Sequence, residues 1–262
     1  MTEKIKEILY EADIKDVGFC SFDDIKDHLL ECRALSRIPK NAKSVIVCLF
    51  PYKVKDNPPE NISRYAAVPD YHKVCGEILR NVTLKLSEQI ENYQFEWFID
   101  NSPIPEVYTA AKAGLGVIGE NSLLINQKYG SFVFIGEIVT DLEIKIENRE
   151  VKRCKNCGLC KTVCPKTDNM PCLSAISQKK GELEKEQIEL LKKNNIVWGC
   201  DICAEICPLN KKAEKTYIKE FINGYRDRFC IGEDIVGRAY EWRGEKTVTR
   251  NARLLEDKNE QN

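Results

Sequence analysis

Apolar residues along the first 150 positions occur in two kinds of pattern, which predict strands and helices in alternation. Residues 44–50 form a continuous apolar run that a proline closes, as is typical of a buried strand. Residues 95–99 form a second, shorter strand candidate. Two further stretches, 122–126 and 131–140, flank a turn-like segment and predict a hairpin.

Between these runs, apolar positions recur at helical spacing. The predicted helices cover residues 5–9, 24–35, 72–93 and 106–113. Alternation of strands and helices favours a layered α/β domain over residues 1–150. The remainder is more polar, with a charged helix predicted at 181–193 and a weakly helical stretch at 217–225.

Composition narrows the function classes. The 262 residues are 43% hydrophobic and carry a formal net charge of −1, so no global charge draws the chain to nucleic acid or to an anionic membrane. The first residues are charged and lack the apolar core of a signal peptide. No apolar run approaches the ~20 residues that span a bilayer, so we expect a cytoplasmic protein with no membrane segment.

Thirteen cysteines are the strongest chemical signal. Residues 154–165 read CKNCGLCKTVCP and residues 200–208 read CDICAEICP. The first has the spacing of bacterial ferredoxins, whose thiolates hold iron–sulfur clusters, and the second repeats its last two spacings. The five other cysteines are scattered, which fits a reducing compartment better than a disulfide framework.

In two-cluster ferredoxins the fourth cysteine of each run binds the other cluster. Applied here, one [4Fe–4S] cluster takes Cys154, Cys157, Cys160 and Cys207. The second takes Cys164, Cys200, Cys203 and, as the natural candidate for the missing ligand, Cys172. The alternative is structural zinc, which also binds paired cysteines. We therefore expect a cluster module at residues 151–215, followed by a polar extension at 216–262.

Six ordered motifs resemble those of epoxyqueuosine reductases. They are RYA with DYH (64–72), FIDNSPIPE (98–106), AGLGVIGEN (113–121), GSFVFIGE (130–137), CLS (172–174) and WGCD (198–201). The resemblance implies a nitroreductase-like cobalamin domain and a ferredoxin-like module with two [4Fe–4S] clusters. It also implies reduction of epoxyqueuosine to queuosine in tRNA by a monomer that receives electrons from a ferredoxin- or flavodoxin-type donor.

The resemblance also assigns site residues. It makes Asp100 the proton donor to the substrate beside the cobalt, a role for which we expect burial to raise its pKa. By itself, Asp100 at a strand end is more typical of a helix N-cap, and the motif match reverses this interpretation. The predicted substrate contacts are Arg64, Tyr71 and His72. The predicted cofactor contacts are Arg37, Tyr65, Asp100, Gly114, Gly116, Gly119, Asn121 and Asp201, although glycines also serve simple turns.

Three departures from the family pattern bear on the substrate. Val107 stands where the family has arginine, and Val117 and Glu120 replace an aromatic residue and a lysine. Residues 250–252 resemble the first residues of the family's C-terminal helical repeat, and the sequence then ends. These changes favour, as a rival, a corrinoid reductase of a small molecule. A second rival is a pure electron carrier. The α/β domain with its own motifs argues against it, because a simple ferredoxin needs no such domain.

Overall fold

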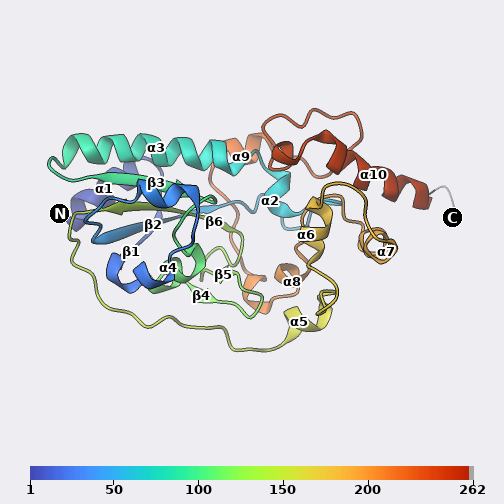
Figure 1. Ribbon diagram of the computed structural model, residues 1–262, viewed down its shortest axis with the longest axis horizontal. Helices are drawn as coiled ribbons and strands as arrows, with labels where there is room; N and C mark the ends of the chain where they lie inside the picture. The colour runs from blue at the N-terminus through green and yellow to red at the C-terminus, as the bar shows by residue number, and fades with distance from the viewer. Residues whose placement is uncertain (260–262) are drawn as a thin grey trace. The chain divides into compact units, whose positions relative to one another are not determined.

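The computed structural model describes residues 1–259, and its contacts divide the chain into two compact units. The sheet unit comprises Met1–Pro51, Tyr71–Cys157 and Lys212–Glu214, and the helical unit comprises Tyr52–Asp70, Gly158–Lys211 and the chain from Lys215 onward. Each unit is thus assembled from separate stretches of sequence (Figure 1). The expected division at residues 150 and 215 remains a prediction.

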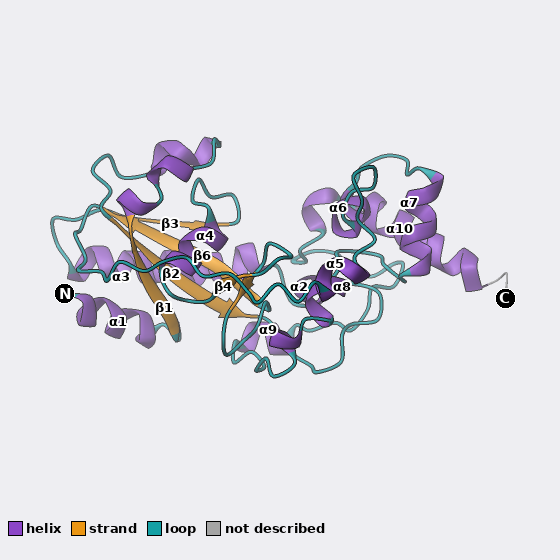
Figure 2. Cartoon of the chain, turned by 90° about the horizontal axis from the view of Figure 1, so that it is seen from below, coloured by secondary structure: helices purple, strands orange, loops and turns teal. Residues whose placement is uncertain are grey.

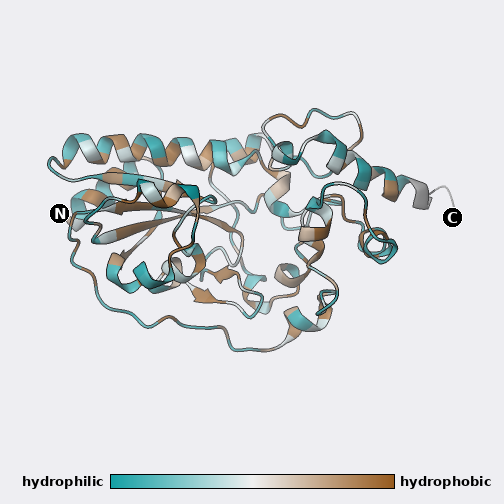
Figure 3. Cartoon of the chain, in the orientation of Figure 1, coloured by the Kyte–Doolittle hydropathy of each residue, from teal (hydrophilic) through white to brown (hydrophobic). Residues whose placement is uncertain are grey.

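The sheet unit is built on a four-stranded antiparallel sheet (Figure 2). Its strands, in spatial order, are β1 (Asp16–Ser21), β2 (Ser44–Pro51), β6 (Val133–Thr140) and β3 (Phe95–Ile99). Every residue of β2 is buried, as its apolar run predicts, and Figure 3 shows the apolar character of the strands. The central strands β2 and β6 therefore form the core of this unit.

Helices cover both faces of this sheet. On one face, Leu79 of α3 (Tyr71–Gln89) lies against β6 at Gly136, and α1 (Thr2–Glu11) packs beside α3. On the other face, Ala110 and Ala111 of α4 (Glu106–Lys112) share a core with Val45 and Val47 of β2 and with Ile135 of β6. Side chains alternate along a strand, so Glu137 points to the α4 face with Ile135.

Two local predictions in this unit were wrong. Residues 24–35 form no single helix, and the region folds into 3₁₀ turns η1 (Phe22–Asp24), η2 (Lys26–His28) and η3 (Arg33–Arg37). The expected hairpin is also absent, because β5 (Leu124–Ile125) pairs with β4 (Val117–Ile118). Strand β6 lies between β2 and β3, so both of its edges are occupied by strands distant in sequence.

The helical unit consists of short helices around an aromatic core. Trp198, Phe229 and Tyr240 meet edge-on at its centre. The helices are α2 (Arg64–Ala67), α5 (Leu159–Val163), α6 (Leu173–Gln178), α7 (Lys185–Lys193), α8 (Ile202–Glu205), α9 (Lys219–Asn223) and α10 (Glu245–Asn259), with 3₁₀ turns η4 (Pro208–Asn210) and η5 (Glu241–Arg243).

Helix α10 was not predicted, because its composition is strongly polar. It packs against α6 and α7, and its apolar side chains Val248, Ala252 and Leu255 join the aromatic core. Those three residues follow helical spacing, so the signal was present in a narrow stripe. Within residues 1–259, none of the helices combines the length and apolar character needed to cross a bilayer.

Candidate active site

Asp100 lies immediately after β3 and is held by the first two residues of α3. Its Oδ1 accepts a hydrogen bond from the Tyr71 hydroxyl at 2.8 Å, and its Oδ2 lies 3.0 Å from His72 Nε2. Its own N–H donates to Glu106 Oε1 at 2.9 Å. Asp100 also adopts a left-handed backbone conformation with φ of 56°, which is uncommon outside glycine and clusters at functional sites.

An aromatic stack supports this carboxylate. The Tyr71 ring lies face to face with Phe134 of β6, with ring centroids 4.1 Å apart and planes 8° apart. The His72 ring stacks on Tyr71 at the same centroid distance. The three rings limit how far Tyr71 and His72 can turn, so both polar groups stay directed at Asp100.

The charge state of Asp100 differs from the sequence-based expectation. Its side chain is 56% exposed, and the hydrogen bond from His72 lowers its pKa, with the Tyr71 hydroxyl adding to the effect. The prediction of a pKa raised by burial is therefore wrong for the protein alone, because the hydrogen bonds stabilise the carboxylate more than desolvation penalises it. Asp100 is ionised at neutral pH in this arrangement.

Two neighbouring glutamates, and not Asp100, are the residues whose pKa is raised. Burial, followed by the charge of Asp100, raises the pKa of Glu106 to about 8. Glu137 is fully buried on β6, and burial together with the charge of Glu106 holds its pKa well above the usual range. Both residues lie within the family-like motifs, but neither was predicted to have a role. The available signal was an acidic residue inside the otherwise apolar run 132–139.

The predicted glycine contacts are explained by packing inside the sheet unit. Gly114 has φ of 81°, which favours glycine. A Cβ on Gly116 would lie 2.5 Å from the Ile125 carbonyl oxygen, and one on Gly119 would lie 2.3 Å from Asn121 Oδ1. These positions therefore let the chain fold closely over the β4–β5 pair. Their predicted role in holding a corrin gains no support from this packing.

Asn121 and Arg37 differ in how far their polar groups are satisfied. The Asn121 Nδ2 atom is buried and has no hydrogen-bond partner among the described residues, so a donor is available to a ligand. Arg37 pairs with Glu96, donates to the Trp97 carbonyl oxygen at 2.9 Å and covers the Phe98 ring. The predicted cofactor contact of each residue remains a prediction.

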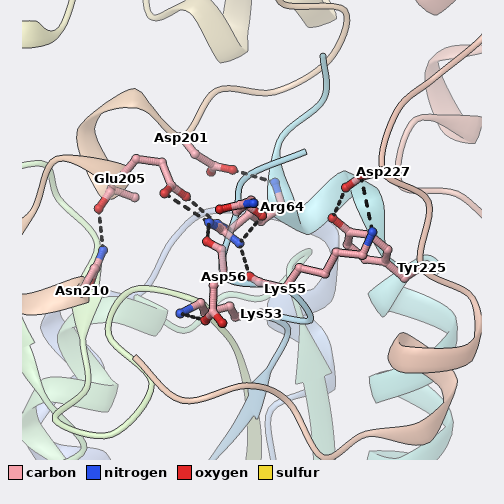
Figure 4. A network of polar contacts seen from close by, with 11 residues as sticks. Lys53, Lys55, Asp56, Arg64, Asp201, Glu205, Asn210, Tyr225 and Asp227 are labelled. Carbon is pink, nitrogen blue, oxygen red and sulfur yellow. Dashed lines mark hydrogen bonds and ion pairs between the residues drawn. The ribbon is translucent and has the colours of Figure 1, made fainter. Parts of the chain in front are cut away.

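Arg64 is the centre of a polar network in the helical unit (Figure 4). It is 3% exposed, and its guanidinium pairs with Glu205 of α8 through two hydrogen bonds. The same group donates to the carbonyl oxygens of Lys55, Asp56 and Asn57. These contacts give Arg64 a structural role, and its predicted contact with substrate gains no support from them.

Tyr65 and Asp201 belong to the same unit. The Tyr65 hydroxyl accepts hydrogen bonds from Trp198 Nε1 at 3.0 Å and from Gln178 Nε2 at 3.4 Å. Asp201 accepts the Arg64 N–H at 2.6 Å, and burial raises the pKa of Asp201 to about 6. The structure thus joins Asp201 to Arg64, whereas the predicted cofactor contacts of Tyr65 and Asp201 remain predictions.

The eight cysteines of the predicted clusters form no disulfide. Burial raises the pKa of Cys200 to about 12, with smaller contributions from Cys172, Asp201 and Cys203. Cys172 and Cys203, which are assigned to the same cluster as Cys200, thus interact with it electrostatically in the helical unit. Among residues 1–259, no three side chains of Cys, His, Asp or Glu converge closely enough to hold a single metal ion. Cluster ligation remains a prediction.

Comparison with known proteins identifies similar chains. A family model described as "Epoxyqueuosine reductase QueG, DUF1730" matches residues 34–101. The epoxyqueuosine reductase of Leadbetterella byssophila is 32% identical over 203 residues, which cover 74% of this chain and 67% of that protein. The epoxyqueuosine reductase of Aliivibrio fischeri is 31% identical over 210 residues, which cover 77% of this chain but only 55% of the relative.

Solved structures extend the similarity to the fold. A crystal structure of epoxyqueuosine reductase with an epoxyqueuosine-modified tRNA-Tyr stem loop matches with a TM-score of 0.81 at 22% identity. The match covers 97% of this chain and 80% of that one. The mixed α/β fold is therefore the fold of those structures.

Proposed function

Because the chain belongs to the epoxyqueuosine reductase family, we propose that it reduces the epoxide of tRNA-bound epoxyqueuosine to the alkene of queuosine. The observation that carries the proposal is the cluster of Asp100, Tyr71 and His72, which places a carboxylate with two donors at the exposed end of β3. The tRNA stem loop bound by a structure of the same fold supports tRNA as the partner.

The reaction defines what these side chains supply. An epoxide becomes an alkene by taking up two electrons and two protons, while both carbon–oxygen bonds break and the oxygen leaves as water. Asp100 delivers a proton to that oxygen. His72 and Tyr71 keep the carboxyl group oriented, and positioning of this kind is a large part of general acid catalysis.

We propose two [4Fe–4S] clusters and cobalamin as cofactors. The donor set fits the clusters, because the eight cysteines have ferredoxin-like spacing and form no disulfide. For cobalamin, the supporting observations are the buried Asn121 Nδ2 atom, which has no partner among the described residues, and the exposed Asp100 carboxylate. When bound, these groups supply low-potential electrons and the reactive metal centre.

The finer predictions belong to the same proposal. The sheet unit is the nitroreductase-like cobalamin domain, and the helical unit carries most of a ferredoxin-like module. The protein acts as a cytoplasmic monomer that accepts electrons from a ferredoxin- or flavodoxin-type donor. Sedimentation of the purified protein and reduction by each donor class test these two statements separately.

Asp100→Asn tests the acid role. Asparagine keeps the size of the side chain and its ability to cap, but it has no acidic proton to give. We expect single-turnover reduction of epoxyqueuosine tRNA by pre-reduced enzyme to slow by about 10²–10⁴-fold, the usual effect of a positioned general acid. Asp23→Asn is the matched control, because Asp23 is an exposed partner of Lys26.

The outcomes separate the hypotheses. Equal rates for wild type and Asp100→Asn would show that Asp100 is only a turn residue. Inactivity of both proteins on the tRNA, with intact cobalamin and cluster spectra, would favour a corrinoid reductase of a small molecule. Absence of any cobalamin binding would favour an electron carrier.

A further inference from the structure

Three carboxyl groups follow one another from the surface of the sheet unit into its core. Asp100 is exposed, Glu106 is partly buried at the start of α4, and Glu137 is 0% exposed on β6. Glu106 Oε1 accepts the Asp100 N–H, and Glu137 lies opposite Phe98 of β3, two residues before Asp100. The sheet register and α4 therefore bring the three side chains into one neighbourhood.

The contacts of Glu137 are those of an uncharged acid. Its Oε2 accepts a hydrogen bond from Ser102 Oγ at 3.3 Å, and its Oε1 has no hydrogen-bond partner among the described residues. The charged group that acts on it, Glu106, is acidic as well. A carboxylate in such a place lacks compensation for desolvation, so the protonated form is favoured.

Glu106 occupies the intermediate position. Its carboxyl group is affected first by burial and then by the charges of Asp100 and His72, of which His72 alone can carry a positive charge. Because burial and the negative charge of Asp100 both disfavour an anion at Glu106, its proton is retained at pH values where an ordinary glutamate has lost it. Asp100 is ionised under the same conditions because of His72 and Tyr71.

We propose that Glu106 stores the proton that Asp100 hands to the substrate, and that its burial beside the uncharged Glu137 keeps it in its acid form. The inference rests on the proposed function for its purpose, since epoxide reduction consumes two protons and the ionised Asp100 must receive each of them. Glu106 acts through Asp100 and does not touch the substrate, so it positions and recharges the acid.

Both protons follow the same route. Glu106 transfers its proton to the Asp100 carboxylate, directly or through one water, and Asp100 gives it to the oxygen as the first carbon–oxygen bond breaks. Glu106 then takes up a proton from solvent, and the same two transfers deliver it as the remaining carbon–oxygen bond breaks and water leaves. The two electrons come from a low-potential one-electron donor of the iron–sulfur or flavin class.

Glu106→Gln separates this role from a structural one. The glutamine amide oxygen can still accept the Asp100 N–H, so a glutamate that only caps the turn is replaced almost silently. If Glu106 stores a proton, the substitution removes it. Glu143→Gln is the matched control, because Glu143 is an exposed partner of Lys43.

The first measurement is an infrared pH titration of the full-length purified protein, which needs no turnover. We expect a protonated-carboxyl band that disappears at about pH 8 in wild type and in Glu143→Gln, and that is missing from Glu106→Gln. If this band is lost near the pH at which an ordinary glutamate ionises, the inference is overturned, whatever the activity of the protein.

The second measurement is the pH profile of single-turnover reduction by the holoenzyme. Wild type should slow above about pH 8 as the acid form of Glu106 is lost. Glu106→Gln should be at least about tenfold slower at neutral pH, and its rate should not show this decrease above pH 8. An unchanged rate and profile in Glu106→Gln would overturn the inference, whereas failure of the proposed function would appear as inactivity in wild type with the infrared band intact.

Discussion

Arg64→Lys tests how much the helical unit depends on one buried ion pair. Arginine presents five N–H donors in a fixed plane, and here they meet the Glu205 carboxylate and three backbone carbonyl oxygens. Lysine keeps the positive charge but offers three donors from one point. It cannot reach both Glu205 oxygens and the carbonyls of residues 55–57 together, so at least two acceptors lose their protein partner.

The size of the effect follows from these contacts. Leaving a buried acceptor unsatisfied costs about 1–3 kcal/mol, and lower values apply where water can replace the lost donor. Glu205 is 32% exposed, so part of its loss is compensated by solvent. For two acceptors we expect the free energy of unfolding to fall by about 2–4 kcal/mol.

Arg228→Lys provides a control with the same chemical change. Arg228 pairs with Glu60 at 3.2 Å, and both side chains are more than half exposed. An exposed pair contributes about 0–1 kcal/mol, so this variant should unfold almost like wild type. Urea denaturation followed by tryptophan fluorescence, to which the buried Trp198 of the helical unit contributes, measures both variants. Similar losses in the two, or a loss below about 1 kcal/mol for Arg64→Lys, would refute the reasoning.

Three further predictions concern titration and cluster ligands. His72→Ala should lower the free energy of unfolding at neutral pH by about 0.5–1 kcal/mol. Asp100 has a lowered folded pKa, so its hydrogen bond stabilises the fold only above its unfolded pKa. The urea curves of wild type and His72→Ala should therefore converge as acid protonates Asp100. Glu106 has the opposite sign: its folded pKa of about 8 exceeds the unfolded value, so wild type should lose stability as pH rises from about 4.5 to 8, and urea curves of Glu106→Gln should lack this loss. Cys164→Ala and Cys207→Ala should each remove about four irons, but from different clusters, so identical electron paramagnetic resonance changes would contradict the crossed ligation.

The elements with strong local signals were predicted correctly. Strand β2 is buried at every residue because its whole sequence is apolar, and α4 ends before Gly114, as expected for a helix stopped by glycine. The hairpin prediction failed because it assumed that neighbours in sequence pair. Strand β6 instead pairs with β2 and β3, and no local pattern records such distant partners.

The site shows the same limit. The resemblance made Asp100 the proton donor and Tyr71 and His72 substrate contacts, and the structure joins these three residues by hydrogen bonds. The protonation states could not be read from the sequence, because they depend on what surrounds each carboxyl in the folded chain. Asp100 proved to be exposed and hydrogen-bonded, whereas Glu106, six residues later, is the one that burial keeps protonated.

The chain passes between the two units more than once, so the order of its synthesis limits when each unit can fold. Arg64 leaves the ribosome 141 residues before Glu205, so at translation rates of ~5–20 residues per second the arginine waits about 7–28 seconds for its partner. The segment around Arg64 has no completed unit to join until α8 has been made. Nascent chains arrested before Glu205 should therefore expose residues 52–70 to protease while the sheet, whose strands end at Thr140, is already protected.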